Sequence, residues 1–407
     1  MMKRLILFII SLFLLSPLFA KDSVIIHSSD LHFLSHEIAE MDDYFLTIIK
    51  NADGKVTHLT PEITSAFVRD MIKLNPDCVI LSGDLTLNGA FESHRDLIQT
   101  LQPLIDNGIP TLVLPGNHDT DSSAYIFRDG KTIETDSIES VDFPIMYEDF
   151  GYSNSIRDEN SLSYLYKLSN KVWILALDTN ANGTFCSVLP ETLTWIEENL
   201  KKAKREGAEV ISVTHQPMTI HNSRFTFGYT VHNSKEVLKL FNKYGVKLNL
   251  SGHLHLQHIN KDTNFTDIAA SSLAVFPNQY GIIKIKDNKL ISYETKSVDV
   301  SSWAKENNIM VSSLLDFPSY SQTFFDDTTI NKLKKQIEKK GLNSKETKQA
   351  LDFATKLNRE YFAGKVTATK NDKGWSIWEN NLKDLSFYSY LNSILKDGVS
   401  DNTNVAF

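Results

Sequence analysis

Thr111-Leu-Val-Leu-Pro-Gly-Asn-His-Asp119 joins a short, largely apolar run directly to a cluster of polar side chains. Continuous apolarity over Thr111–Leu114 is typical of a strand that is covered on both faces of a sheet. The polar cluster Gly116-Asn-His-Asp119 follows where the chain leaves that strand. In open α/β sheets, ligands gather beyond the carboxyl ends of the strands. This stretch therefore predicts a functional site at a sheet edge.

The rest of the chain alternates similar apolar runs with helical patterns. Five further runs are predicted as strands: Val24–Ile26, Cys78–Leu81, Val172–Leu177, Val210–Val213 and Val246–Leu250. Three helices are predicted from Pro or Asn at their starts and from Gly or Asn-Pro at their ends: residues 60–74, 190–207 and 233–245. This alternation predicts an α/β domain.

Four more polar clusters follow predicted strands. They are Asp30-Leu-His32, Gly83-Asp84, His215 and Gly252-His-Leu-His255. Each one alone has an ordinary explanation as a turn, a cap or a buried histidine with satisfied hydrogen bonds. Five clusters at five strand ends instead favour one shared metal site.

The ordered set D-x-H, G-D, G-N-H-D, H and G-H-x-H resembles the calcineurin-like metallophosphoesterase superfamily over residues 24 to about 298. The resemblance implies an α-β-β-α sandwich and two metal ions. One ion would be held by Asp30, His32, Asp84 and His255, and the other by Asp84, Asn117, His215 and His253. It also implies that His118 stabilises the transition state or protonates the leaving oxygen, with Asp119 orienting its imidazole. Either residue could instead serve only the turn.

Carboxylate, imidazole and amide ligands without a thiolate suit Mn²⁺, Fe or Zn²⁺. Such a pair of divalent or trivalent ions lowers the pKa of a bridging water, and the resulting hydroxide attacks phosphorus. We therefore expect a metal-dependent phosphodiesterase. A phosphomonoesterase or nucleotidase of the same fold is the nearest alternative, and an inactive, metal-stabilised binding module is the second.

The character of the chain changes near Ser301, where strands give way to helical patterns. One helix is predicted from a cap at Asp327 or Thr328 to Gly341, a second from Ser344 to Gly364, and an aromatic-rich segment spans Trp375 to about Leu395. We expect a metallophosphoesterase domain over residues 21–302 and a smaller helical domain over 303–407.

This tail extends the resemblance to secreted bacterial cyclic-nucleotide phosphodiesterases, although its match around Asn358-Arg-Glu-Tyr-Phe-Ala-Gly364 is looser than the metal motifs. A 3′,5′-cyclic nucleotide is therefore the leading substrate. The tail's aromatic residues could stack on a nucleobase or fill a core: Tyr361, Phe362, Trp375, Trp378 and Tyr388.

The first 20 residues have the pattern of a signal peptide. Lys3 and Arg4 precede the apolar run Leu5–Leu15, and Ala20 offers a cleavage end, which predicts export to the periplasm or the exterior. An uncleaved membrane anchor is the weaker alternative, because the apolar run is shorter than the roughly 18 residues that span a bilayer. After cleavage no membrane span is expected.

The charge excludes a uniform basic surface for a nucleic-acid polymer. The whole chain carries −8, and loss of two basic residues with the signal leaves 40 basic against 50 acidic residues, or −10. The expected partner is a small phosphoester, such as a nucleotide, whose charge the bound cations would screen. No oligomeric state is predicted. The two cysteines, Cys78 and Cys186, are expected as buried thiols or, alternatively, as one disulfide.

Overall fold

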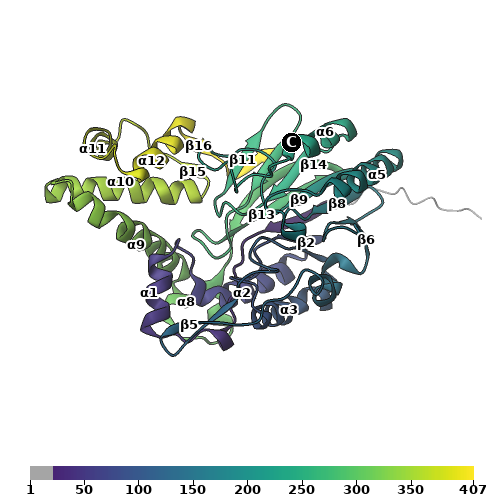
Figure 1. Cartoon of the computed structure of the whole chain (residues 1–407), viewed down its shortest axis with the longest axis horizontal. Helices are drawn as coiled ribbons and strands as arrows, with labels where there is room; N and C mark the ends of the chain where they lie inside the picture. Colours follow the sequence, from purple (N-terminus) through teal and green to yellow (C-terminus); the bar gives the residue numbers. More distant parts are fainter. Residues whose placement is uncertain (1–21) are drawn as a thin grey trace, which may run out of the picture.

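Two mixed sheets form the centre of the molecule, which the computed structural model describes over residues 22–407 (Figure 1). The predicted signal peptide lies outside the described residues. The six-stranded sheet has the order β17-β14-β13-β1-β2-β3, with bounds β1 Ser23–Ser28, β2 Cys78–Ser82, β3 Thr111–Leu114, β13 Gln279–Lys286, β14 Lys289–Ser297 and β17 Asn404–Ala406. The seven-stranded sheet has the order β11-β12-β10-β9-β8-β7-β6, with bounds β6 Ser155–Arg157, β7 Tyr164–Lys167, β8 Val172–Leu177, β9 Glu209–Thr214, β10 Leu248–Ser251, β11 His258–Lys261 and β12 Thr266–Ala269.

Each sheet contains a block of parallel strands. In the first sheet β1, β2 and β3 are parallel, and in the second β8, β9, β10 and β12 are parallel. The remaining strands pair antiparallel, as β13 does with β1 and with β14. The carboxyl ends of parallel neighbours meet at one edge, so this topology brings the predicted polar clusters together.

Helices cover the outer faces of the sheets (Figure 1). α2 Thr60–Leu74 and α3 Phe91–Asp106 cover one sheet, and α5 Pro190–Glu206 and α6 Ser234–Tyr244 cover the other. The sheet region also contains α1 Asp43–Asn51 and α4 Phe143–Met146. Four short helical turns and two small hairpins complete the sheet region and its surroundings: η1 His36–Ile38, η2 Thr57–Leu59, η3 Glu148–Tyr152, η4 Ala181–Gly183, β4 Tyr125–Arg128 with β5 Lys131–Glu134, and β15 Lys365–Val366 with β16 Ser400–Asp401.

The hydrophobic core divides along these layers. Ile26 from the first sheet and Ile174 from the second are buried in one cluster that also contains Phe67 of α2. The other face of the second sheet presents Trp173 to α5 and α6, where Ile196 and Phe241 are buried. The predicted α-β-β-α sandwich is therefore confirmed.

The three predicted helices of the sheet region form with the predicted ends. α2 has Pro61 in its first turn, and its C-cap Asn75 is left-handed. α5 begins at Pro190, and α5 and α6 end at the left-handed glycines Gly207 and Gly245. A glycine there pays no Cβ penalty, which is why it ends helices so often.

The carboxy-terminal region is helical, as predicted, and lies to one side of the sheets in Figure 1. Its helices are α7 Val300–Glu306, α8 Ser312–Leu315, α9 Phe317–Glu338, α10 Ser344–Phe362, α11 Lys373–Asn381 and α12 Ser386–Asp397. Their own core contains Trp375, Trp378 and Tyr361, all buried. Of the two expectations for these rings, core filling is the one that the structure supports.

Two predicted helix starts in this region are wrong. α9 begins at Phe317, not at Asp327 or Thr328, because buried Phe317 and Phe324 pack its early turns into the main core. α10 is capped by Asn343, not Ser344, because Asn343 and Glu346 form a reciprocal capping box. Local polar signals missed the first start because tertiary packing determines it.

The end of the chain returns to the first sheet. β17 pairs antiparallel with β14, joining Val405 to Tyr293.

None of the helices within residues 22–407 combines the length and apolarity that crossing a bilayer requires. Cys78 and Cys186 are both free and buried, so they form no disulfide here.

Candidate metal centre

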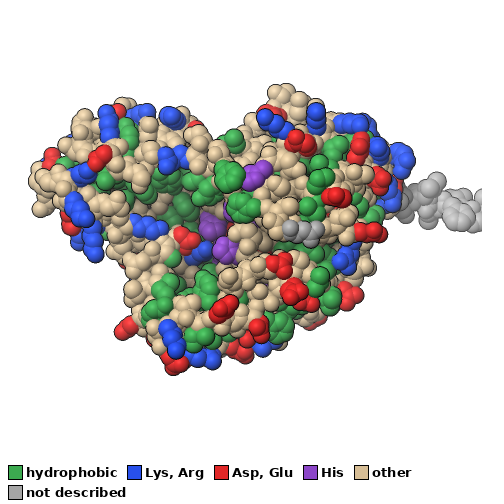
Figure 2. All heavy atoms as spheres, in the orientation of Figure 1, with side chains coloured by type: hydrophobic (Ala, Val, Ile, Leu, Met, Phe, Trp, Pro, Cys, Tyr) green, Lys and Arg blue, Asp and Glu red, His purple; other side chains and the backbone are tan. Residues whose placement is uncertain are grey.

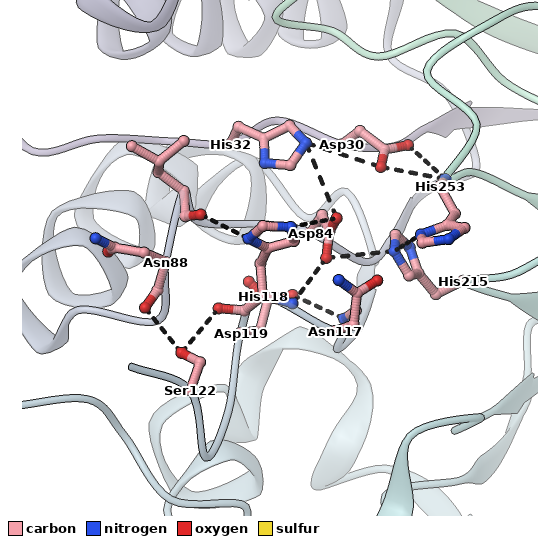
Figure 3. Close-up of polar contacts among 12 residues, drawn as sticks. Asp30, His32, Asp84, Asn88, Asn117, His118, Asp119, Ser122, His215 and His253 are labelled. Atoms are coloured by element: carbon pink, nitrogen blue, oxygen red, sulfur yellow. Dashed lines mark hydrogen bonds and ion pairs between the residues drawn. The ribbon is translucent and has the colours of Figure 1, made fainter. Parts of the chain in front are cut away.

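The loops after five strands converge at one edge of the sandwich (Figure 3). Backbone hydrogen bonds fix the loops to one another: Asp30 N donates to Gly83 O at 3.0 Å, and Gly252 N donates to His215 O at 2.9 Å. The loops after β1 and β2 are thus joined, as are those after β9 and β10. The predicted site residues are carried by this joined set of loops.

The first group of converging side chains consists of Asp30, His32, Asp84 and His255. One oxygen or nitrogen from each lies within 4.8 Å of the others. His255 Nε2 is 3.4 Å from Asp30 Oδ1 and 2.9 Å from His32 Nε2. This is the first of the two sets expected from the sequence.

The second group consists of Asp84, His215 and His253. His215 Nε2 lies 3.3 Å from Asp84 Oδ1, and His253 Nδ1 lies 3.3 Å from His215 Nε2. Asn117 stands beside Asp84 in Figure 3, and its Oδ1 is 3.5 Å from Gln216 Nε2. All seven predicted ligands therefore lie in one place.

Asp84 belongs to both groups, and its two oxygens face different ways. Oδ2 is 3.9 Å from His32 Nε2, while Oδ1 is 3.3 Å from His215 Nε2. The carboxylate is buried, with 1% of the residue exposed. A carboxylate in this position can bind two cations at once.

The ring nitrogens that face away from the site are held by backbone carbonyls. His215 Nδ1 donates to Ser82 O at 2.9 Å, and His253 Nε2 donates to Gly228 O at 2.9 Å. Because a carbonyl only accepts, these bonds place the protons on the outer nitrogens. The inner nitrogens are therefore the atoms that a metal ion can take in place of a proton.

The donor set fits cations. His32 Nε2 and His255 Nε2 face each other at 2.9 Å beside two carboxylates, an arrangement that positive charge would stabilise. Burial lowers the pKa of His215, yet Asp84 and Asp30 outweigh it and raise that pKa to about 9. Burial opposes ionisation of Asp84 too, but the neighbouring His215 and His118 hold its pKa well below the usual range. The same negative field that favours a proton here favours a metal ion.

Backbone strain is concentrated in this centre. Asp30, His32, Asp84, His253 and His255 all have positive φ, between 43° and 65°. Few residues other than glycine adopt this region, although Asp, Asn and His tolerate it better than most. Such strain typically persists at functional sites, where the surrounding structure enforces it.

His118 lies at the rim of the centre, with its side chain 42% exposed. Its Nδ1 donates to Leu87 O at 2.9 Å, which leaves Nε2 facing the site at 3.9 Å from Asp84 Oδ2. The expectation that Asp119 orients this imidazole is wrong, because Leu87 O holds the ring instead.

Asp119 has a different structural task. Its carboxylate accepts hydrogen bonds from Leu85 N at 3.0 Å, Thr86 N at 2.9 Å and Gly116 N at 2.8 Å. Burial, and next the charge of Asp84, raise the pKa of Asp119 to about 6. The carboxylate thus joins the loops after β2 and β3, and it positions Asp84 and Asn117 through the backbone amides of their neighbours Leu85 and Gly116.

His94 forms a hydrogen bond with the backbone carbonyl of Asp119. Its Nε2 donates to Asp119 O at 2.9 Å, and its Nδ1 accepts from Tyr147 Oη at 2.8 Å. The ring is fully buried, and burial lowers its pKa to about 4. Each ring nitrogen of the neutral imidazole has a hydrogen-bond partner, so the folded protein requires His94 to be uncharged.

This requirement predicts a loss of stability in acid. An unfolded histidine titrates near pH 6.5, so below that pH the unfolded chain binds a proton that folded His94 refuses. Stability should fall by about 1.4 kcal/mol per pH unit from this group, or about 2 kcal/mol by pH 5. Denaturant unfolding of wild type and His94→Gln at pH 7 and pH 5 measures it. Equal pH slopes in the two proteins would contradict the prediction.

Several residues near the centre were not found from the sequence. Lys55 is 9% exposed and forms an ion pair with Asp53 at 3.0 Å. The pKa of His32 is lowered mainly by burial and next by the positive charge of Lys55. Gln216 contacts Asn117, and Gly228 contacts His253. Only the position of Gln216, next to His215, offered any signal in the sequence.

The chain matches two families of known proteins. The sequence profile described as calcineurin-like phosphoesterase matches residues 23–257, more than half of the chain. The profile described as the C-terminal domain of cyclic nucleotide phosphodiesterase matches residues 299–401.

Individual relatives are distant. A protein of Ruthia magnifica subsp. Calyptogena magnifica named "Probable cyclic nucleotide phosphodiesterase" is 23% identical over 223 residues, which cover 54% of this chain and 79% of that protein. One of Arcobacter nitrofigilis named "Probable glycerophosphodiester phosphodiesterase GpdQ" is 24% identical over 264 residues, or 63% and 86%. A crystal structure of a dimetal phosphatase from Danio rerio is 11% identical, with a TM-score of 0.48 and coverage of 67% and 95%.

Proposed function

The chain belongs to the calcineurin-like phosphoesterase family and is a metal-dependent phosphoester hydrolase, and from this premise we propose that its substrate is a phosphodiester, with a 3′,5′-cyclic nucleotide as the leading candidate. The sharing of Asp84 between two groups of converging ligand atoms carries the proposal. The names of the relatives and the match of the tail to a cyclic-nucleotide phosphodiesterase profile support the choice of substrate.

In this proposal the seven predicted ligands hold two ions of Mn, Fe or Zn. Asp30, His32, Asp84 and His255 would hold the first ion, and Asp84, Asn117, His215 and His253 would hold the second. Bound cations of this kind activate water and neutralise the charge that develops on a phosphoryl group. The carbonyls of Ser82 and Gly228 keep two of the imidazoles in the tautomer and orientation that binding requires.

His118 assists the leaving group. Leu87 O fixes its Nδ1 proton, so Nε2 is the atom that can hold a second proton and give it to the departing oxygen. Its exposure at the rim leaves it accessible to a bound ester. Asp119 contributes by positioning the two loops that flank the phosphate, not by acting on His118.

A panel of phosphoesters tests the proposal. The purified protein, loaded in turn with Mn²⁺, Fe²⁺ or Zn²⁺, is assayed with 3′,5′-cyclic AMP, sn-glycero-3-phosphoethanolamine, bis(p-nitrophenyl) phosphate and p-nitrophenyl phosphate. Preference for the diesters supports a phosphodiesterase. Preference for the monoester would favour a phosphomonoesterase, and no turnover with any metal would favour a binding module.

Metal removal should lower thermal stability. The centre brings buried carboxylates and imidazoles together, and a ligand at about 1,000 times its Kd stabilises the folded state by about 4 kcal/mol. Adding Mn²⁺ to chelator-treated protein should therefore raise the Tm by several degrees, as measured by calorimetry. The rise should be absent in Asp84→Asn, and an equal rise in that variant would place the metal elsewhere.

We also propose that the protein is exported and that its domain boundary lies between residues 302 and 303. Residues 1–20 would be removed, and residues 21–302 and 303–407 would form the metallophosphoesterase and helical domains. Mass spectrometry of the protein recovered from a bacterial periplasm tests export, since cleavage after Ala20 gives Lys21 as the first residue.

A further inference from the structure

The segment between Asn222 and His232 carries aromatic side chains to the edge of the metal centre. It includes Gly228, whose carbonyl accepts the Nε2 proton of His253 at 2.9 Å. The next residue is Tyr229, whose ring centroid lies 5.8 Å from that of His253. The segment thus contacts a proposed ligand through its backbone and presents an aromatic ring beside it.

Exposed aromatic rings gather at this place. Six large aromatic side chains of the described residues are exposed: Tyr44, Phe91, Phe185, Phe227, Tyr229 and Phe407. Phe227 is 79% exposed and Tyr229 is 41% exposed. Phe185 joins them, because a Cβ at Gly228 would lie 3.1 Å from its ring. In Figure 2 hydrophobic side chains border the hollow in which histidines are visible.

The helical region holds this segment in place. Asn222 Nδ2 donates to Tyr361 Oη at 2.9 Å, and Arg224 Nη1 donates to Ser389 Oγ at 2.6 Å. Phe225, which lies 5.1 Å from the Tyr229 ring, also packs against Tyr390 with ring centroids 6.2 Å apart. The buried rings of the tail therefore serve the site indirectly, by supporting an aromatic surface that belongs to the sheet domain.

We propose that Tyr229 is the stacking surface for the planar base of the substrate, a role that rests on the proposed cleavage of a nucleotide diester. A nucleotide separates its phosphate from its base by one ribose, so a base whose phosphate lies at the metal centre must reach a neighbouring surface. Tyr229 is exposed on that surface, while Tyr361, Trp375 and Trp378 of the tail are buried. Stacking tolerates any base, because every base has a π face. The substrate class is therefore a phosphodiester with a planar ring, preferred over small alkyl diesters.

The test compares substrates with and without a base. The ratio of kcat/KM for 3′,5′-cyclic AMP to that for sn-glycero-3-phosphoethanolamine should fall about tenfold in Tyr229→Leu, the size expected for loss of one stacked ring. Tyr229→Phe keeps the ring and should keep the ratio. Phe91→Leu, which removes an exposed ring on α3 away from the loop, is the matched control. A ratio is insensitive to any loss of folded protein.

A binding measurement gives an independent readout. Calorimetry on the metal-loaded protein compares adenosine 5′-monophosphate with ribose 5-phosphate, and the base should improve Kd about tenfold in wild type but not in Tyr229→Leu. Unchanged ratios in Tyr229→Leu would overturn the stacking surface while leaving phosphodiester hydrolysis intact. Absence of turnover of both diesters by wild type would instead sink the proposed function, and the Kd comparison would still decide the role of Tyr229.

Discussion

Asp84→Asn is expected to lower phosphodiester turnover by on the order of 10³-fold while leaving the fold formed, since one uncharged oxygen would replace a carboxylate that serves both ions. Its two oxygens face separate groups of nitrogen atoms, 3.9 Å from His32 and 3.3 Å from His215. No other predicted ligand belongs to both groups. The substitution is therefore expected to weaken both ions, which elemental analysis of the purified variant measures.

Asp178→Asn provides the matched control. Asp178 is also buried and also follows a parallel strand, β8, but its oxygens accept from Leu162 N and Asn180 N and lie outside both ligand groups. This variant should keep its metal content and turnover. If Asp84→Asn instead retained wild-type metal content and rate, the proposed centre would have to be abandoned.

Gly116→Ala should have the second-largest effect. A Cβ at Gly116 would overlap both the backbone N and the Oδ1 of Asp84, so either the loop after β2 or the loop after β3 must move. A misplacement of about 1 Å at a catalytic centre can cost about 100-fold in rate. We expect a loss of at least about that size, accompanied by weaker metal binding in an equilibrium titration.

The control for this change is Gly130→Ala. A Cβ at Gly130 meets nothing within 4 Å, although its positive φ of 65° carries a modest strain. This variant should retain full activity and metal affinity and lose only a little stability. Wild-type activity in Gly116→Ala would show that the two loops are not packed as described.

Only some parts of the fold could be predicted from local patterns. Apolar runs followed by turns predicted six strands of the two sheets, and β3 and β8 have the predicted bounds. Short outer strands such as β6 and β11 escaped prediction because half-buried segments lack a continuous apolar run. The start of α9 and the return of β17 to the first sheet depend on packing partners far away in the chain.

For the proposed metal site, too, the sequence predicted some features and not others. Motifs at strand ends pointed to all seven residues, and their convergence is what the parallel topology produces. The roles around them were less predictable. The family resemblance implied that Asp119 orients His118, whereas the carboxylate turns toward backbone amides of the preceding loop. Adjacent residues in a tight turn often point apart, so contact cannot be read from their spacing.

By itself, the sequence determined six strands and three helices of the sheet region and which side chains could bind metal, because periodicity, turn residues and ligand chemistry are local properties. The tertiary structure alone decided which oxygen of Asp84 faces which imidazole, which carbonyl holds each ring, and which aromatic surface borders the centre. These are contacts between residues as far apart as Asn222 and Tyr361, and long-range packing sets them.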